Sequence, residues 1–128
     1  VPITDSQPKA QWSIPGLDIA AARDRLGGDD VLLGKVLGLF RQTEAESPLR
    51  IRAALAAGDA ELCQRLAHTL KSTAGSVGAN RLQAAARVIE ETIRACGSVG
   101  EELLGELETA HAEAMAGLDS LDSNEERR

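Results

Sequence analysis

The chain has 128 residues, which is enough for one domain with a single hydrophobic core and too short for two. Aromatic residues make up only 2% of it, so the core has to consist of Leu, Ile, Val and Ala, and a nucleic-acid site that stacks bases on aromatic rings is disfavoured. The net charge of −6 also opposes binding to a phosphate backbone, and no run of 18 apolar residues is present to span a membrane.

The two ends of the chain differ in composition from its middle. Residues 1–15 are polar, contain three prolines and are predicted to form a linker or disordered tail. The first residue is Val1 rather than Met, which together with this tail indicates a fragment of a longer protein. Residues 119–128 are charged and are expected to fray. The folded domain is therefore predicted to cover residues 16–118.

Capping residues, glycines and helical spacing of apolar residues predict six helices between these ends. They cover residues 18–27, 29–45, 47–57, 59–76, 82–96 and 98–118. Three of them begin at an aspartate that can cap the helix, namely Asp18, Asp29 and Asp59. Ser47-Pro48 is predicted to be a cap followed by proline at the first helical position, and Ser98-x-x-Glu101 is predicted to be a capping box.

The predicted fold class is all-α. No segment alternates apolar and polar residues with a period of two, so no strand is expected. Short connections favour antiparallel neighbours. The chain is thus expected to form an up-and-down antiparallel four-helix bundle with additional short N-terminal helices. The bundle is predicted to consist mainly of helices 29–45, 59–76, 82–96 and 98–118, with the other helices at one end or side.

The chain contains two cysteines, Cys63 and Cys96, both at helical positions. Two cysteines do not make a disulfide framework. Both are therefore expected to be reduced, buried thiols of a cytosolic protein.

The most informative residue is His68. At about 100° per residue, Leu62, Leu66 and Leu70 form one stripe of a helix, and His68 lies on the opposite side. The imidazole is therefore predicted to face solvent. Lys71 lies one turn away. Ser72 and Gly75, four and seven residues after His68, are small residues that leave the ring uncovered. Such a surface suits a ring that another protein has to reach.

Other chemistries fit these residues less well. Glu108-x-x-His111 has the spacing of a di-iron bundle ligand pair, but Arg65 stands where a second copy before His68 would need a glutamate, so no metal site is predicted. The serines and histidines form no nucleophile elbow, and Gly75-x-x-Gly78 lacks the residues of a phosphate-binding loop. A purely structural helical bundle is compatible with the periodicity.

The run from Ala67 to Gly78, Ala-His-x-Leu-Lys-small-x-Ala-Gly-x-Val-Gly, resembles the signature of histidine-containing phosphotransfer (HPt) domains of multistep phosphorelays. The resemblance covers residues 16–118. It departs from the family at Ser72, where the family usually has glycine. It implies a phosphorelay intermediate that accepts a phosphoryl group from a receiver-domain aspartate onto His68 and passes it to a response-regulator aspartate. The alternative is a non-phosphorylated helical protein-docking module.

The resemblance also implies roles for single residues. His68 would react through Nε2, and Lys71 would supply positive charge to the phosphoryl oxygens. Glu90 stands where relatives carry a polar side chain, often Gln, near the histidine. Two interpretations of Glu90 stay open: a partner of the imidazole, or an ordinary solvated helix residue. The docking surface for the receiver would comprise Gln64, Ser72 and Gly75.

The same resemblance sets expectations for cofactors and partners. The chain has no room for an ATP site, so it is expected to be a phosphotransfer carrier without enzymatic activity, from the C-terminal part of a hybrid sensor histidine kinase. It is expected to bind no cofactor, because the Mg²⁺ would belong to the partner receiver. The expected partners are the receiver domains of a hybrid kinase and of a response regulator, with no nucleic acid and no membrane contact. We expect a monomer in the cytoplasm, with the parent chain anchored in the inner membrane.

Overall fold

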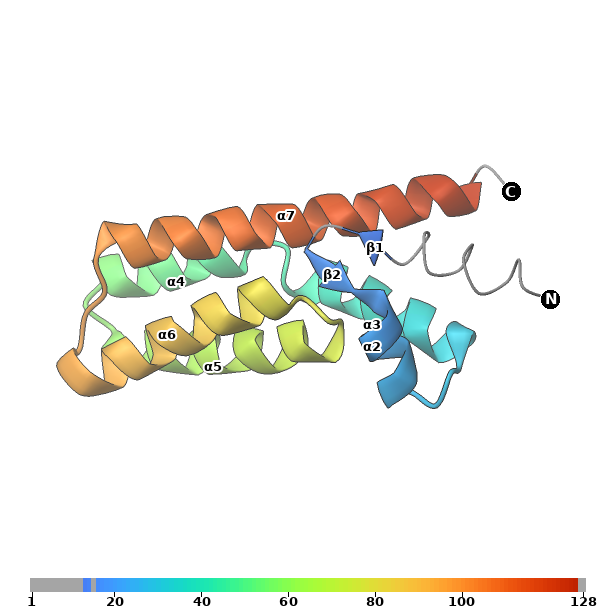
Figure 1. The fold of residues 1–128 in the computed structure, drawn as a ribbon. Helices are drawn as coiled ribbons and strands as arrows, with labels where there is room; N and C mark the ends of the chain where they lie inside the picture. The colour runs from blue at the N-terminus through green and yellow to red at the C-terminus, as the bar shows by residue number, and fades with distance from the viewer. Residues whose placement is uncertain (1–12, 15, 127–128) are drawn as a thin grey trace.

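The computed structural model describes residues 13–14 and 16–126. They form two short strands and six helices, labelled in Figure 1. In chain order these are β1 (Ser13–Ile14), β2 (Leu17–Asp18), α2 (Ile19–Arg25), α3 (Asp30–Thr43), α4 (Ser47–Ala56), α5 (Ala60–Ser76), α6 (Asn80–Cys96) and α7 (Glu101–Glu126). The predicted all-α bundle is confirmed.

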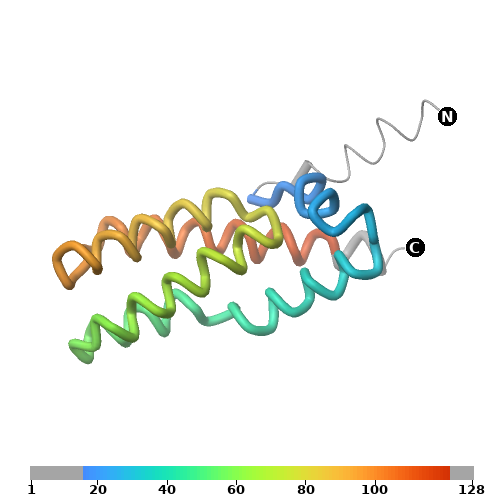
Figure 2. The backbone as a smooth tube through the Cα atoms, turned by 90° about the horizontal axis from the view of Figure 1, so that it is seen from below, coloured from blue at the N-terminus to red at the C-terminus, as the bar shows by residue number. Residues whose placement is uncertain are grey.

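The bundle consists of α4, α5, α6 and α7. The closest pair is the hairpin of α5 and α6, and α4 packs against α5 while α7 packs against both α6 and α4. The prediction that helix 29–45 would be the fourth main member is wrong, because α3 makes fewer contacts with α5 and α7 than α4 does. Figure 2 shows why: α3 and α4 follow one another along one edge of the molecule, and only α4 lies beside most of α5.

Aspartate caps start three of the helices as predicted. The side chains of Asp18, Asp29 and Asp59 accept hydrogen bonds from backbone N–H groups three residues on, at 3.1, 3.0 and 3.0 Å. The other two predicted caps are wrong. Ser47 is the first residue of α4, and its hydroxyl donates to the Glu44 side chain instead. The first turn of α7 closes from Leu104 N–H onto Gly100 O at 3.3 Å, so Ser98 lies outside the helix.

The prediction that the chain has no strands is also wrong at one point. β1 and β2 form an antiparallel pair with Ser13 opposite Asp18. A pair of two-residue strands is too short to produce the alternation by which strands are found in a sequence. Asp18 N–H donates to Gly78 O at 2.6 Å, and a Cβ on Gly78 would lie 2.2 Å from Asp18 O. This contact holds the N-terminal segment against the turn between α5 and α6.

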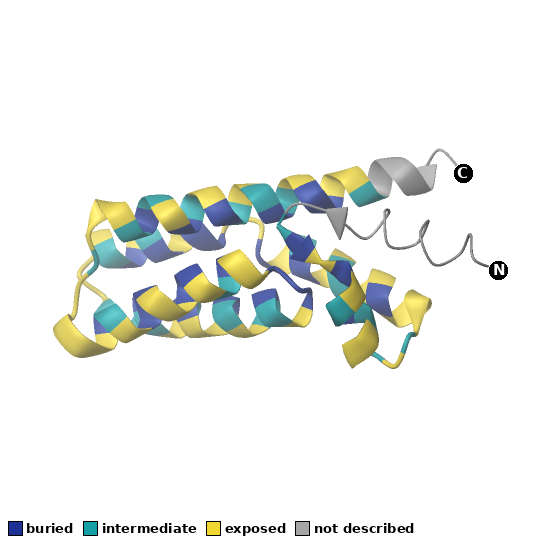
Figure 3. Ribbon diagram, in the orientation of Figure 1, coloured by how far each residue is buried: buried dark blue, intermediate teal, exposed yellow. Residues whose placement is uncertain are grey.

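The core lies between the inner faces of the helices, shown in dark blue in Figure 3. Apart from Phe40 and Cys63 it is aliphatic, as the composition predicted. The buried residues of α5 are Cys63, Ala67, Leu70 and Ala74. Leu62 and Leu66 are only partly buried, so the buried stripe is rotated from the predicted one. Cys96 is exposed, which corrects the prediction that both thiols are buried; its Sγ donates to Thr92 O at 3.2 Å at the end of α6.

Helix α7 is longer than predicted and strongly acidic. It runs to Glu126, past the expected end at Leu118. Arginines from three other helices bind its carboxylates: Arg41 of α3, Arg52 of α4 and Arg81 of α6. These ion pairs hold α7 along the bundle. Within residues 13–14 and 16–126, none of the helices is both long and apolar enough to cross a lipid bilayer.

Candidate functional site

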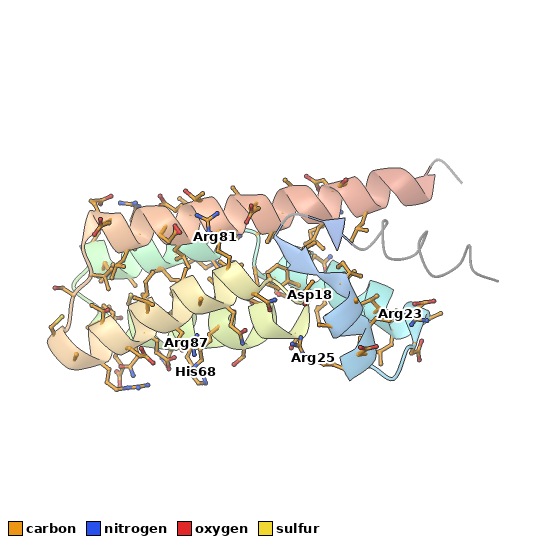
Figure 4. All side chains as sticks on the ribbon, viewed as in Figure 1. Asp18, Arg23, Arg25, His68, Arg81 and Arg87 are labelled. Atoms are coloured by element: carbon orange, nitrogen blue, oxygen red, sulfur yellow. The ribbon has the colours of Figure 1, made fainter. Side chains whose placement is uncertain are left out.

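The candidate site is centred on His68, in the middle of α5. Its side chain is 59% exposed, while its neighbours in the sequence on the inner face, Ala67 and Leu70, are fully buried. The predicted orientation of the ring toward solvent therefore agrees with the structure. Figure 4 shows His68 at the outer edge of the α5–α6 hairpin.

Glu90 of α6 contacts the imidazole ring. Its Oε2 lies 2.7 Å from His68 Nδ1, and only 4% of the Glu90 side chain is exposed. Of the two interpretations that the sequence left open, the solvated helix residue does not fit this burial. A buried carboxylate without partners would be costly, so its contacts determine whether it stays charged.

Three groups stabilise the Glu90 carboxylate. Lys71 Nζ lies 2.7 Å from its Oε1, and Arg94 Nη2 lies 3.1 Å from its Oε2, beside His68 Nδ1. The hydrogen bond from Lys71, followed by that from His68, holds the pKa of Glu90 below its ordinary value, against the opposing effect of burial. The carboxylate is therefore ionised at neutral pH.

The ionised state of Glu90 determines the tautomer of the imidazole. A carboxylate only accepts hydrogen bonds, so His68 Nδ1 has to carry the proton that it donates to Oε2. In the neutral ring, Nε2 then keeps its lone pair. The site thus presents a nucleophilic nitrogen on an exposed ring whose other nitrogen is held in place.

Arg94 is a part of the site that the sequence interpretation missed. It follows Glu90 by four residues on α6, a spacing at which an acidic and a basic side chain meet on a helix. That signal was available in the sequence. The spacing of Glu90 and Arg94 indicates a functional contact only because Glu90 is buried, since exposed pairs at this spacing are common and contribute little.

The three residues predicted to form the docking surface have different surroundings. Ser72 is exposed and Gln64 is partly buried. Gly75 lies against α6, where a Cβ would come within 2.4 Å of Gln83 Nε2, so its small size also has a reason within the domain. Its carbonyl oxygen accepts a hydrogen bond from the Arg25 guanidinium of α2.

The residues of the considered metal site are engaged elsewhere. Glu108 accepts from Arg52 Nε at 2.9 Å, and His111 Nε2 donates to the carbonyl oxygen of Glu44 at 2.7 Å. In the part of the chain that the structure describes, no three His, Cys, Asp or Glu side chains are grouped so as to hold a metal ion.

Comparison with known proteins adds one finding. The family model of the Hpt domain matches residues 35–121, which include all of α4, α5 and α6 and most of α3 and α7. No curated protein and no solved structure matches the chain.

Proposed function

This chain belongs to the Hpt domain family, and on that premise we propose that His68 carries the phosphoryl group. The family match confirms the resemblance that the run around His68 indicated. Hpt domains are phosphotransfer carriers of two-component signalling, not kinases, and they interact with receiver domains. The observation that carries the proposal for His68 is an exposed imidazole whose Nδ1–H is held by the buried Glu90 carboxylate.

The proposed reaction is an exchange between an acyl phosphate and the imidazole. The lone pair of His68 Nε2 forms the new N–P bond while the P–O bond to the receiver aspartate breaks, and the aspartate leaves as a carboxylate. Nε2 carries no proton beforehand, so none has to be removed. Reversal of the same step onto a second receiver aspartate passes the phosphoryl group on. The transition state resembles metaphosphate, so the protein contributes mainly position and charge.

Glu90 would support this reaction in two ways. It fixes the tautomer that leaves Nε2 nucleophilic, and it stabilises the positive charge that the ring acquires when the N–P bond forms. Its own negative charge is offset by Lys71 and Arg94, so it does not repel the incoming phosphoryl group. Lys71 then contributes charge to the site through Glu90 as well as toward the phosphoryl oxygens.

We also propose which receiver domains exchange the phosphoryl group with His68. The donor is the receiver domain of a hybrid sensor kinase and the acceptor is that of a response regulator. The Mg²⁺ required for the aspartate chemistry belongs to the receiver. The exposed ring of His68 and the exposed Ser72 beside it offer the approach that a receiver needs.

Incubation with a phosphorylated receiver domain and Mg²⁺ tests the proposal. We expect an acid-labile, alkali-stable phosphate on this chain, and complete loss of labelling in His68→Gln with the fold unchanged, since exposed substitutions alter stability by about 0.5 kcal/mol or less. His111→Gln is the matched control, because it changes the only other histidine of the chain. If His68→Gln is labelled like the wild type, the assignment of His68 is wrong. If the wild type accepts no phosphate, the domain acts as a docking module instead.

A further inference from the structure

The two cations that contact Glu90, Lys71 and Arg94, are already paired with its carboxylate. A phosphoryl group brings a charge of about −1.5 to −2 at neutral pH. Lys71, three residues after His68, already lies 2.7 Å from Glu90 Oε1. If Lys71 moved wholly to the phosphoryl oxygens, that buried oxygen would lose its partner, which is costly. An exposed cation without such a partner would therefore be better placed to bind the phosphoryl oxygens.

Arg87 of α6 lies on the face of that helix that borders α5. The positions of α6 three and seven residues on, Glu90 and Arg94, turn toward His68, and Arg87 is offset from Glu90 by only about 60° around the helix. Arg81, by contrast, points the other way and binds Glu106 of α7. In the view of Figure 4, Arg87 and His68 are both labelled at the edge of the α5–α6 hairpin away from α7, and Arg81 lies on the side of α7.

The register of the α5–α6 hairpin places Arg87 about one helical turn from the level of His68. Glu90 of α6 contacts His68 and Lys71 of α5, and Gln83, seven residues earlier on α6, lies against Gly75 of α5. Arg87 lies between Gln83 and Glu90 on α6, so it faces the segment of α5 between His68 and Gly75. This is the side of His68 on which the small Ser72 and Gly75 leave room.

Arg87 is also available to bind an anion. It is exposed, and no hydrogen bond or ion pair joins its side chain to another residue in the described part of the chain. The other arginine of the site, Arg94, is bound to Glu90. A guanidinium presents two parallel N–H groups that match the oxygens of a phosphoryl group.

We propose that Arg87 is a phosphoryl-binding residue, which donates from its guanidinium to the oxygens of the phosphoryl group on His68 Nε2. This inference rests on the proposed function and adds a specific contact to it. Lys71 then keeps its bond to Glu90 while Arg87 neutralises the transferred group. With Lys71 on Glu90 and Arg87 on the phosphoryl group, the buried Glu90 carboxylate stays paired throughout the reaction.

The test uses a donor that needs no protein interface. Phosphoramidate labels an accessible histidine when Nε2 forms the N–P bond and ammonia leaves. The variants are Arg87→Ala and Arg87→Lys, with Arg50→Ala as the matched control, an exposed arginine on α4 without a side-chain partner in the described residues. Two quantities are measured: the rate of labelling, and the pH at which the bound phosphoryl group takes up a proton, followed by ³¹P NMR.

We expect Arg87→Ala to raise the protonation midpoint of the phosphoryl group, because a nearby cation favours the dianion. Labelling should slow about threefold, the factor that corresponds to one exposed charged contact, with Arg87→Lys in between and Arg50→Ala unchanged. A midpoint in Arg87→Ala equal to that of the wild type overturns the proposal, even if transfer from a receiver is slower, since Arg87 would then act only in docking. A wild type that takes phosphate from phosphoramidate but not from a receiver contradicts the proposed function and leaves the Arg87 measurement valid.

Discussion

Replacement of Glu90 by alanine is the sharpest test of how the site works. The change removes the acceptor of the His68 Nδ1 hydrogen bond and leaves Lys71 and Arg94 without a partner at this position. A charge-assisted hydrogen bond contributes about 1.5–3 kcal/mol net, and we take the lower end because the ring is more than half exposed. That corresponds to about a tenfold slower transfer, since 1.4 kcal/mol is a factor of about ten.

The effect on stability should be smaller than for a typical buried ion pair. Removal of one buried partner costs about 3–5 kcal/mol when the other charge stays buried. Here the side chains of His68, Lys71 and Arg94 are 59, 27 and 61% exposed, so they regain water when Glu90 is lost. We therefore expect a loss of about 1–2 kcal/mol in the free energy of unfolding.

The assay is rapid-quench transfer from a phosphorylated receiver, with urea unfolding of each variant to show that the domain is folded at the assay temperature. Glu91→Ala is the matched control, because this neighbour on α6 is exposed and its side chain makes no hydrogen bond or ion pair in the described residues. Glu90→Gln should fall between wild type and alanine, since an amide oxygen still accepts from Nδ1 without the charge. A Glu90→Ala domain that transfers at the wild-type rate, or a Glu91→Ala domain with the same defect, refutes the role of Glu90.

Four further outcomes are expected. Lys71→Ala should slow transfer from a receiver about threefold to fivefold in the same assay, and an unchanged rate would show that its charge is not used. Ser72→Trp should block transfer from a receiver while phosphoramidate still labels the chain; equal loss with both donors would contradict a docking role. Gly78→Ala should lose more than about 2 kcal/mol in urea unfolding, because a side chain meets the backbone there, whereas Gly97→Ala has a similar φ in open space and should lose about 1 kcal/mol. Because the pKa of Glu90 is lowered on folding, its stabilisation is present above the ordinary value of 4.5 and lost as pH falls through the folded value, so the stability difference between wild type and Glu90→Gln should shrink in acid and be largest near neutral pH.

Features that depend on near neighbours in the chain could be predicted from the sequence. An aspartate before an apolar repeat starts a helix whatever packs on it later, and Asp18, Asp29 and Asp59 all do so. The exposure of His68 follows from helical geometry in the same way. The family signature likewise lies in one continuous run, residues 67–78, which covers the second half of α5 and the turn after it.

Predictions that needed the partner helices were less complete. Ser98 and Glu101 have the spacing of a capping box, but Glu101 instead accepts from Arg52 Nη1 of α4 at 2.6 Å, and α7 starts after Gly100. Cys96 continues the apolar repeat of α6, yet it is exposed because α6 ends there, at Gly97. Which of two consecutive helices lies beside α5 depends on the path between α3 and α4, and local signals do not describe that path.

The sequence by itself determined where three of the helices begin, that the chain is an all-α bundle, and that His68 points to water, because capping, turn geometry and a 3.6-residue period act over a few neighbouring residues. Only the tertiary structure decided that Glu90 is buried and ionised against His68, Lys71 and Arg94. The sequence left two interpretations of Glu90 open, a partner of the imidazole or a solvated helix residue. Whether such a residue meets water or a neighbouring helix depends on the register of α5 against α6, which is settled by the packing of their whole length.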